Sequence, residues 1–396
     1  MIDEEPSPGI SERGKRGLKV ILVAALVIVA SSLAWLYPTM AAKTKPASPA
    51  TLWPTTTPGD YVFYQFLDPS VGWAMGVAYG SRNPGRYWVA RTMDGAQHWE
   101  AQLRGQVSPR FGAGASTIQF FDKTHGFVAV GVPLELNRTV DGVSWTKMAL
   151  PDEEGAFATF SDSRHGWLLA GTYPTQNTPS RLYATDDAGV SWRRLVDPPV
   201  GSFRMAFRSP HEGWLWTVNQ SSHFIYLSRD GGQSWQSLDI PEPPGRSPGQ
   251  TDLVYNLRLL PGVGVVTSLG FSGGNAFQLL GIEITSFDMG KSWTYVQPPA
   301  KNQDQSQRFL RSEGFEDATH WWSVERGNLY KSVDAGQTWK PLPAKLENGD
   351  NWGYGIQVLD AKHAFSQVGM GQVTGLVMTS DGGLHWTRAN VPEPAS

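Results

Sequence analysis

One eight-residue pattern recurs along this chain and limits its fold more than any other feature. It reads Ser or Thr, any residue, Asp, any residue, Gly, two further residues and Trp, and the stretch 228–235 is a full copy. Ala96 replaces Gly in the first copy, and the second copy is one residue short. The aspartates of the seven copies are Asp94, Asp141, Asp187, Asp230, Asp288, Asp334 and Asp381. Their spacings of 47, 46, 43, 58, 46 and 47 residues indicate a repeat protein.

A pair of residues spaced by seven precedes most of these boxes. The pairs are Phe66 and Trp73, Phe120 and Phe127, Phe160 and Trp167, Phe207 and Trp214, Phe315 and Trp322, and Val358 and Phe365. The fifth repeat is degenerate, with Val265 expected at the Trp position. Each repeat therefore predicts a strand, a tight turn, a strand, a loop, a strand, the Asp turn and a last strand. Seven such units predict an all-β, seven-bladed β-propeller of four-stranded antiparallel blades.

The recurring box resembles the Asp-box, or BNR, repeat of sialidase and sortilin-type propellers. The Gly166–Trp167 strand that accompanies it looks most like the photosystem II assembly and stability factor family. The resemblance covers residues 61–390, and it implies a β-propeller that acts in the assembly of a protein complex. Fold likeness by itself leaves the function open, because propellers of this kind have unrelated functions.

The N-terminal sixty residues predict a membrane anchor and a spacer. Residues 1–19 are polar and include a basic cluster, and an uncharged apolar run from Val20 to Leu36 follows. We expect a cytoplasmic segment at 1–19, a transmembrane signal-anchor helix at 20–37, a linker rich in Pro, Thr and Ala at 38–59, and the propeller at 60–396. A single-pass protein with its propeller outside the cytoplasm follows. A cleaved signal peptide is the alternative.

The chemistry of the boxes points to structure rather than catalysis. Each box carboxylate is expected to accept hydrogen bonds from backbone N–H groups in its own turn, and the ring symmetry distributes the seven aspartates over seven blades. Six of the eight histidines occupy repeat positions in the same way, and the chain has no cysteine. We therefore predict no catalytic residue, no metal site and no bound cofactor among these repeat positions.

Constant and variable spacings separate the two faces of the predicted ring. The box turns and the first turn of each repeat keep their lengths, whereas the loops between second and third strands and between blades vary. Variable loops carry binding residues, so the face that they form is the expected binding face. The candidate binding residues there are Arg82, Arg86, Arg110, Tyr173, Arg181 and Trp352, the last in an expected loop. The arginines suit a carboxylate or an acidic partner, and Trp352 suits a sugar ring.

The resulting functional hypothesis is a non-enzymatic scaffold that binds another exported or membrane protein. The formal net charge of −3 gives no basis for nucleic-acid binding. A sialidase-like glycoside hydrolase and a carbohydrate-binding propeller are the alternatives, but no Arg-Ile-Pro or Arg-Leu-Pro segment of the sialidase type occurs. Acid–base catalysis depends on the separation of two carboxylates, which spacing does not give, so the enzyme question stays open at this stage.

Overall fold

The structure is a computed structural model. It describes residues 60–78, 85–107, 116–171, 179–217, 224–242, 251–262, 264–273, 276–297, 311–325, 327–348, 351–370 and 373–392. The expected cytoplasmic segment, anchor helix and linker lie outside these residues. Within the described ranges, no helix has the length and apolar content that crossing a membrane requires.

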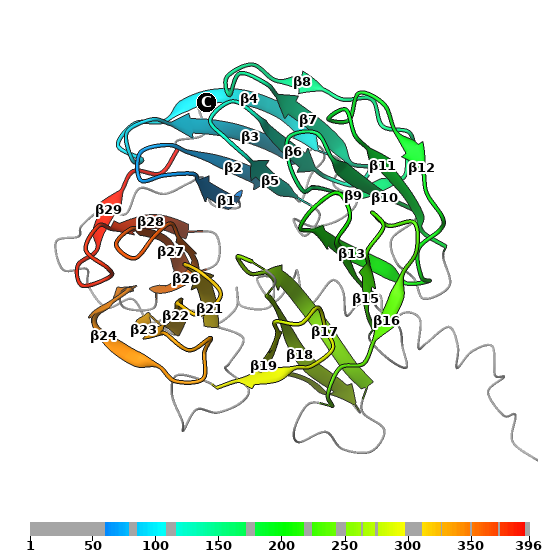
Figure 1. Ribbon diagram of the computed structural model, residues 1–396. Helices are drawn as coiled ribbons and strands as arrows, with labels where there is room; N and C mark the ends of the chain where they lie inside the picture. Colours follow the sequence, from blue (N-terminus) through cyan, green and yellow to red (C-terminus); the bar gives the residue numbers. More distant parts are fainter. Residues whose placement is uncertain are drawn as a thin grey trace, which may run out of the picture. The chain divides into compact units, whose positions relative to one another are not determined.

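Seven antiparallel sheets, each built from consecutive strands, account for the described elements (Figure 1). Blade 1 consists of β1 (Asp60–Phe66), β2 (Gly72–Ala78), β3 (Gly85–Thr92) and β4 (Glu100–Val107), and blade 2 of β5 (Thr117–Phe120), β6 (Gly126–Val130), β7 (Glu135–Thr139) and β8 (Thr146–Lys147). Blade 3 consists of β9 (Gly155–Phe160), β10 (Gly166–Ala170), β11 (Arg181–Thr185) and β12 (Arg193–Arg194), and blade 4 of β13 (Ser202–Phe207), β14 (Gly213–Thr217), β15 (Ile225–Ser228) and β16 (Gln236–Leu238).

Blade 5 consists of β17 (Thr251–Leu259), β18 (Val265–Gly273), β19 (Ala276–Ser286) and β20 (Thr294–Val296). Blade 6 consists of β21 (Arg311–Phe315), β22 (Trp321–Glu325), β23 (Asn328–Ser332) and β24 (Lys340–Lys345). Blade 7 consists of β25 (Glu347–Asn348), β26 (Asn351–Val358), β27 (Ala364–Met370), β28 (Val373–Thr379) and β29 (Thr387–Ala389). The predicted all-β, seven-bladed propeller is confirmed. Two details differ from the prediction.

The first difference is in blade 7, where the short strand β25 adds a fifth strand next to β26. The second is in blade 5, where the expected position of Val265 is wrong by one residue. Val265 pairs with the box residue Ser286, as Gly72 pairs with Thr92 in blade 1. Val266 therefore occupies the position of Trp73. Both valines are fully buried, so a buried apolar residue is kept at each of the two positions.

Stacked aromatic rings join neighbouring blades. Trp73 stacks on Phe120 of blade 2 with ring centroids 3.6 Å apart, and Phe127 stacks on Phe160 of blade 3 at 3.5 Å. Trp167 stacks on Phe207 in the same way at 3.5 Å. The two residues of each seven-spaced pair thus contact different neighbours. Their burial removes apolar surface from both blades, which is the main stabilising contribution of such an interface.

Glycine before the second-strand aromatic makes room for the first-strand ring of the same blade. A Cβ added to Gly72 would lie 2.4 Å from Cδ1 of Phe66, and one added to Gly166 would lie 2.3 Å from Cδ1 of Phe160. Any larger residue at these two positions would displace the ring from the interface between the blades. This contact explains why Gly precedes the aromatic residue in four of the blades.

Glutamine side chains form a second link between blades. Oε1 of Gln65 accepts a hydrogen bond from the backbone N–H of Phe120 at 2.7 Å, and its Nε2 donates to the carbonyl oxygen of the same residue at 2.9 Å. Gln119 bonds Phe160 of blade 3 in the same two-point manner. A carboxamide carries the same donor and acceptor as a peptide unit. Each glutamine therefore hydrogen-bonds the free backbone edge of the first strand in the next blade, as a neighbouring strand would.

The box residues bond within their own turns, as blade 3 illustrates. The Thr185 hydroxyl donates to Asp187 Oδ1 at 2.8 Å and accepts the backbone N–H of Gly189 at 2.8 Å. Asp187 Oδ1 also accepts the backbone N–H of Ser191 at 2.9 Å. In all seven boxes the Ser or Thr hydroxyl donates to the Asp carboxylate.

The box turns lie beside the first turn of the same blade. The backbone N–H of Ala188 donates to the carbonyl oxygen of Arg164 at 2.8 Å, and that of Gly231 donates to His211 at 2.9 Å. Both constant-length turns are therefore on one face of the propeller, as their constant spacing predicted. The strand ends that the variable-length loops connect are at the opposite end of each antiparallel blade.

The box carboxylate can be tested against its neighbour in the sequence. Asp187→Ala removes the acceptor of the Ser191 N–H and of the Thr185 hydroxyl, and we expect a loss of about 1–2 kcal/mol in the free energy of unfolding. The adjacent Asp186 is exposed, and Asp186→Ala is the control, with an expected change of at most about 0.5 kcal/mol. Chemical denaturation measures both, and equal losses would contradict the turn-locking role.

A pH dependence follows from the same bonds. The Ser191 hydroxyl and backbone N–H donate to Asp187 and lower its pKa to about 2, and the pKa of Asp288 is lowered to about 2 by the corresponding groups of Ser292. A folded-state pKa below the ordinary value of about 3.9 means that the stabilisation is present above about pH 4 and is lost as the pH falls through about 2. We expect the melting temperature to fall between pH 4 and pH 2, less steeply in Asp187→Ala than in Asp186→Ala. A flat profile in this window would contradict the assignment.

Candidate functional site

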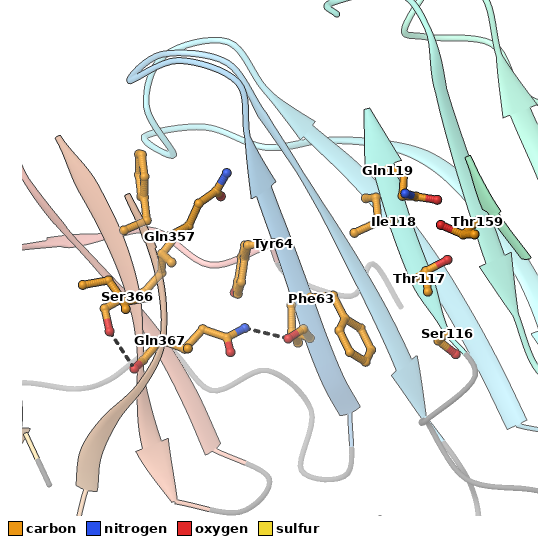
Figure 2. A pocket seen from close by; sticks show the side chains of 15 residues that line it. Phe63, Tyr64, Ser116, Thr117, Ile118, Gln119, Thr159, Gln357, Ser366 and Gln367 are labelled. Carbon is orange, nitrogen blue, oxygen red and sulfur yellow. Dashed lines mark hydrogen bonds between the residues drawn. The ribbon is translucent and has the colours of Figure 1, made fainter. Parts of the chain in front are cut away.

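One cavity is lined by residues of blades 7, 1 and 2 and by Thr159 of blade 3. It has a volume of about 460 Å³ and is lined by Val62, Phe63, Tyr64, Ser116, Thr117, Ile118, Gln119, Thr159, Gly355, Ile356, Gln357, Phe365, Ser366, Gln367 and Leu376. We call it the seam pocket. Figure 2 shows side chains of β26 and β27 on one side, those of β1 in the middle, and those of β5 together with Ser116 and Thr159 of β9 on the other. Its volume is in the range of small-ligand and short-peptide sites.

Strand alternation and a bulge shape the pocket. The inner strand β26 shifts its register against β27 between Tyr354 and Ile356, so that Gly355 is the extra residue. Gly355 has φ of 67°, in the left-handed region that favours glycine. A Cβ there would lie 3.0 Å from Oε1 of Gln367. A glycine at the bulge therefore keeps the wall of the pocket open beside the Gln367 amide.

Hydrogen bonds across the pocket hold two blades in place. Nε2 of Gln367 on β27 donates to the carbonyl oxygen of Val62 on β1 at 2.6 Å (Figure 2). Gln357 on β26 accepts the backbone N–H of Phe66 at 2.8 Å and donates to its carbonyl oxygen at 2.7 Å. The amides of the pocket are thus oriented by the backbone of the facing blade. Such fixed groups are typical of preorganised binding sites.

The lining is uncharged. Hydroxyl and amide groups alternate with aromatic and aliphatic side chains, and the described lining includes no Asp, Glu, Lys, Arg or His. A charged ligand would lose its hydration here without gaining an opposite charge. The pocket suits a neutral ligand that presents apolar side chains and hydrogen-bonding groups.

The structure describes three of the six candidate binding residues that were predicted from the sequence. Arg82, Arg110 and Tyr173 lie outside the described residues. Arg86 is exposed on β3 of blade 1, where its backbone pairs with Ala78 and Gln106.

Trp352 was expected in a loop, and this position is wrong. It lies in β26 of blade 7, paired with Glu347 and Gly369. The extra strand β25 is the reason, because it pairs with β26 and so places Trp352 in a strand where a loop was expected.

Arg181 of blade 3 bonds carboxylates of the connection that leads into its blade. Its Nε donates to Asp152 Oδ2 at 2.6 Å, and Nη2 donates to Asp152 Oδ1 at 3.0 Å and to Glu154 Oε2 at 2.8 Å. The Tyr183 hydroxyl also donates to Asp152. The guanidinium lowers the pKa of Asp152 to about 2. These bonds fix the connection between blades 2 and 3, so the two carboxylates already occupy the acid-binding side of this arginine.

The histidines pair with nearby aspartates instead of meeting one another. Nδ1 of His125, His165, His320 and His363 lies 2.8–2.9 Å from an oxygen of the Asp three residues before it. Among the described residues, no group of three or more His, Cys, Asp or Glu side chains could hold a metal ion. The seam pocket was not predicted from the sequence. Two of its lining residues, Gln119 and Gln357, directly precede a first-strand position of the repeat, as Gln65 does in blade 1.

Comparison with known proteins adds the following relatives. No family model matches the chain. The photosystem II assembly protein Ycf48 of Synechococcus sp. (strain JA-2-3B'a(2-13)) is 23% identical over 299 residues, which cover 75% of this chain and 79% of that protein. A solved structure of YCF48 bound to D1 peptide aligns with a TM-score of 0.54 and 18% identity, covering 88% of this chain and 97% of that one. YCF48 from Cyanidioschyzon merolae aligns with a TM-score of 0.52 and 17% identity over 83% and 96% of the two chains. The resemblance expected from the sequence is confirmed: this chain is similar in sequence and in fold to the photosystem II assembly protein Ycf48.

Proposed function

We propose that this protein is a non-enzymatic scaffold, anchored in a membrane by residues 20–37, that binds another exported or membrane protein during the assembly of a complex. In this proposal the N-terminus is cytoplasmic and the propeller lies outside the cytoplasm, because the basic residues precede the apolar run. The similarity to Ycf48 supports an assembly role. One solved relative is bound to a D1 peptide, which is a precedent for a peptide ligand on this fold.

The uncharged seam pocket is the observation that carries the proposal. Most glycoside hydrolases use two carboxyl groups beside the scissile bond, and the described lining supplies none. Neutral polar and apolar groups on the inner strands instead match the alternating side chains and backbone groups of a peptide. The pocket therefore supports binding better than hydrolysis.

A pair of threonine variants tests the proposal. Thr117 is half-buried and lines the pocket on β5, whereas Thr146 is exposed on β8, the outermost strand of the same blade. Thr117→Arg places a long charged side chain in the pocket, and Thr146→Arg adds the same charge away from it. In affinity capture of the tagged full chain from solubilised membranes of its own cells, we expect one protein to be recovered with the wild type and with Thr146→Arg, and recovery to fall at least about tenfold with Thr117→Arg.

Mass spectrometry identifies the captured protein, and binding of its purified form to the same three proteins confirms direct contact. Two results would overturn the proposal. One is equal capture by Thr117→Arg and wild type. The other is release of reducing sugars from a polysaccharide panel by the purified wild-type chain.

A further inference from the structure

The junction between blade 7 and blade 1 differs from every other junction in the ring. Each sheet is built from consecutive strands, so no strand from one end of the described chain completes a sheet at the other end. The chain itself connects each remaining pair of neighbouring blades. Blade 7 and blade 1 are joined only by non-covalent contacts, and we call this junction the seam. Figure 1 shows its two sides as the blue strand β1 and the brown and red strands β26 to β29.

Side chains replace the missing strand at the seam. Phe66 stacks on Phe365 with ring centroids 3.5 Å apart, and Gln357 bonds both backbone groups of Phe66. Farther out, Nε1 of Trp99 donates to the carbonyl oxygen of Asn390 at 2.8 Å, and the Asn390 N–H donates to Ala96 at 2.9 Å. These contacts resemble those at the other junctions. What the seam lacks is the covalent tether that keeps two separated blades close together.

An untethered junction is the place where a ring opens first. After a local separation at any other junction, the connecting chain keeps the two blades at a high effective concentration. At the seam no connecting chain supplies this effective concentration. Because the contacts at the seam resemble those at the other junctions, the seam is expected to open at a lower free-energy cost than any of them.

The seam pocket spans this junction. Its lining comes from Gly355–Gln357, Phe365–Gln367 and Leu376 of blade 7, from Val62–Tyr64 of blade 1, from Ser116–Gln119 of blade 2 and from Thr159 of blade 3. A ligand that fills it therefore contacts both sides of the seam at once. Opening the seam separates the two walls, so the ligand would lose its contacts with one of them.

The lining also defines the class of ligand. Apolar surface from Phe63 and Ile356 lies among the hydroxyl and amide groups, and the described walls bear no charge. An extended segment alternates its side chains between two sides and can reach blades 7, 1 and 2 in succession at about 3.3 Å per residue. A lysine or glutamate side chain that points into the pocket would lose its hydration without an opposite charge beside it.

We propose that the seam pocket binds an extended, uncharged peptide segment, and that the bound segment holds the propeller ring closed by bridging blades 7, 1 and 2. The inference rests on the proposed function, since the segment belongs to the protein that the scaffold binds. It adds the chemical class of the segment and its effect on the ring.

Thiol labelling can test the proposal, because the chain contains no cysteine. Ala389 is 7% exposed and packs at the seam with Phe66 and Phe365, whereas Ala184 is 2% exposed in the core shared by blades 3 and 4. Ala389→Cys reports opening of the seam, and Ala184→Cys is the matched control at a tethered junction. If Ala389→Cys does not fold, Val391→Cys in the same seam cluster replaces it.

The probes are two libraries of blocked nonapeptides. One consists of Ala, Leu, Phe, Pro, Ser, Thr and Gln, and the other has the same composition with Lys or Glu at two positions. The tightest-binding member of the uncharged library is added to each cysteine variant at about ten times its dissociation constant. We expect labelling to slow about tenfold at Ala389→Cys, because opening must compete with binding, and less than about twofold at Ala184→Cys.

Three results would overturn the inference. If the bound peptide slows labelling of both cysteines equally, or binds without slowing the labelling of either, the ligand does not act at the seam. Equal or tighter binding by the charged library would contradict the ligand class. Failure of both libraries with saturable binding of an oligosaccharide panel would assign the pocket to carbohydrate. In each case, capture of a partner that depends on Thr117 would leave the proposed function standing.

Discussion

The contact between neighbouring blades is the interaction on which this structure depends. A single four-stranded sheet of about 45 residues cannot bury both of its faces, and the rings of Trp73, Phe127 and Trp167 are buried only because the next blade supplies Phe120, Phe160 and Phe207. The glutamine links add direction to this packing, since two hydrogen bonds to one residue fix how far one sheet slides along the other. Geometry at the centre of the ring, including the seam pocket, is a result of these repeated contacts.

The turns and the strand order could be predicted from the sequence because each depends on residues close together within one repeat. The Asp boxes, the tight first turns and the order of strands all depend on neighbours less than ten residues away, so seven copies of one pattern predicted seven sheets. Blade 5 shows the limit of this reading. Without an aromatic residue, spacing alone placed Val265 where the register places Val266.

The candidate site depends on residues that are distant in the sequence, and for that reason spacing did not reveal it. Gln357 bonds a residue 291 positions away, and Gln367 bonds one 305 positions away. A glutamine before an apolar strand position has no special meaning until the ring brings another backbone edge beside it. The arginines attracted attention because charge is visible in a sequence. Arg181, however, is bonded to Asp152 and Glu154 of the connection between blades 2 and 3, and the described lining of the pocket is neutral.

The construction of every blade from consecutive strands has a consequence for how such a ring can change in evolution. In a propeller closed by strand exchange, a cut between repeats divides one sheet, so an added repeat must also restore the shared sheet. Here a cut between any two blades leaves complete sheets on both sides. An in-frame duplication of one repeat would add a whole blade, and the only surfaces that would need to be matched again are the two faces that meet between the last blade and the first.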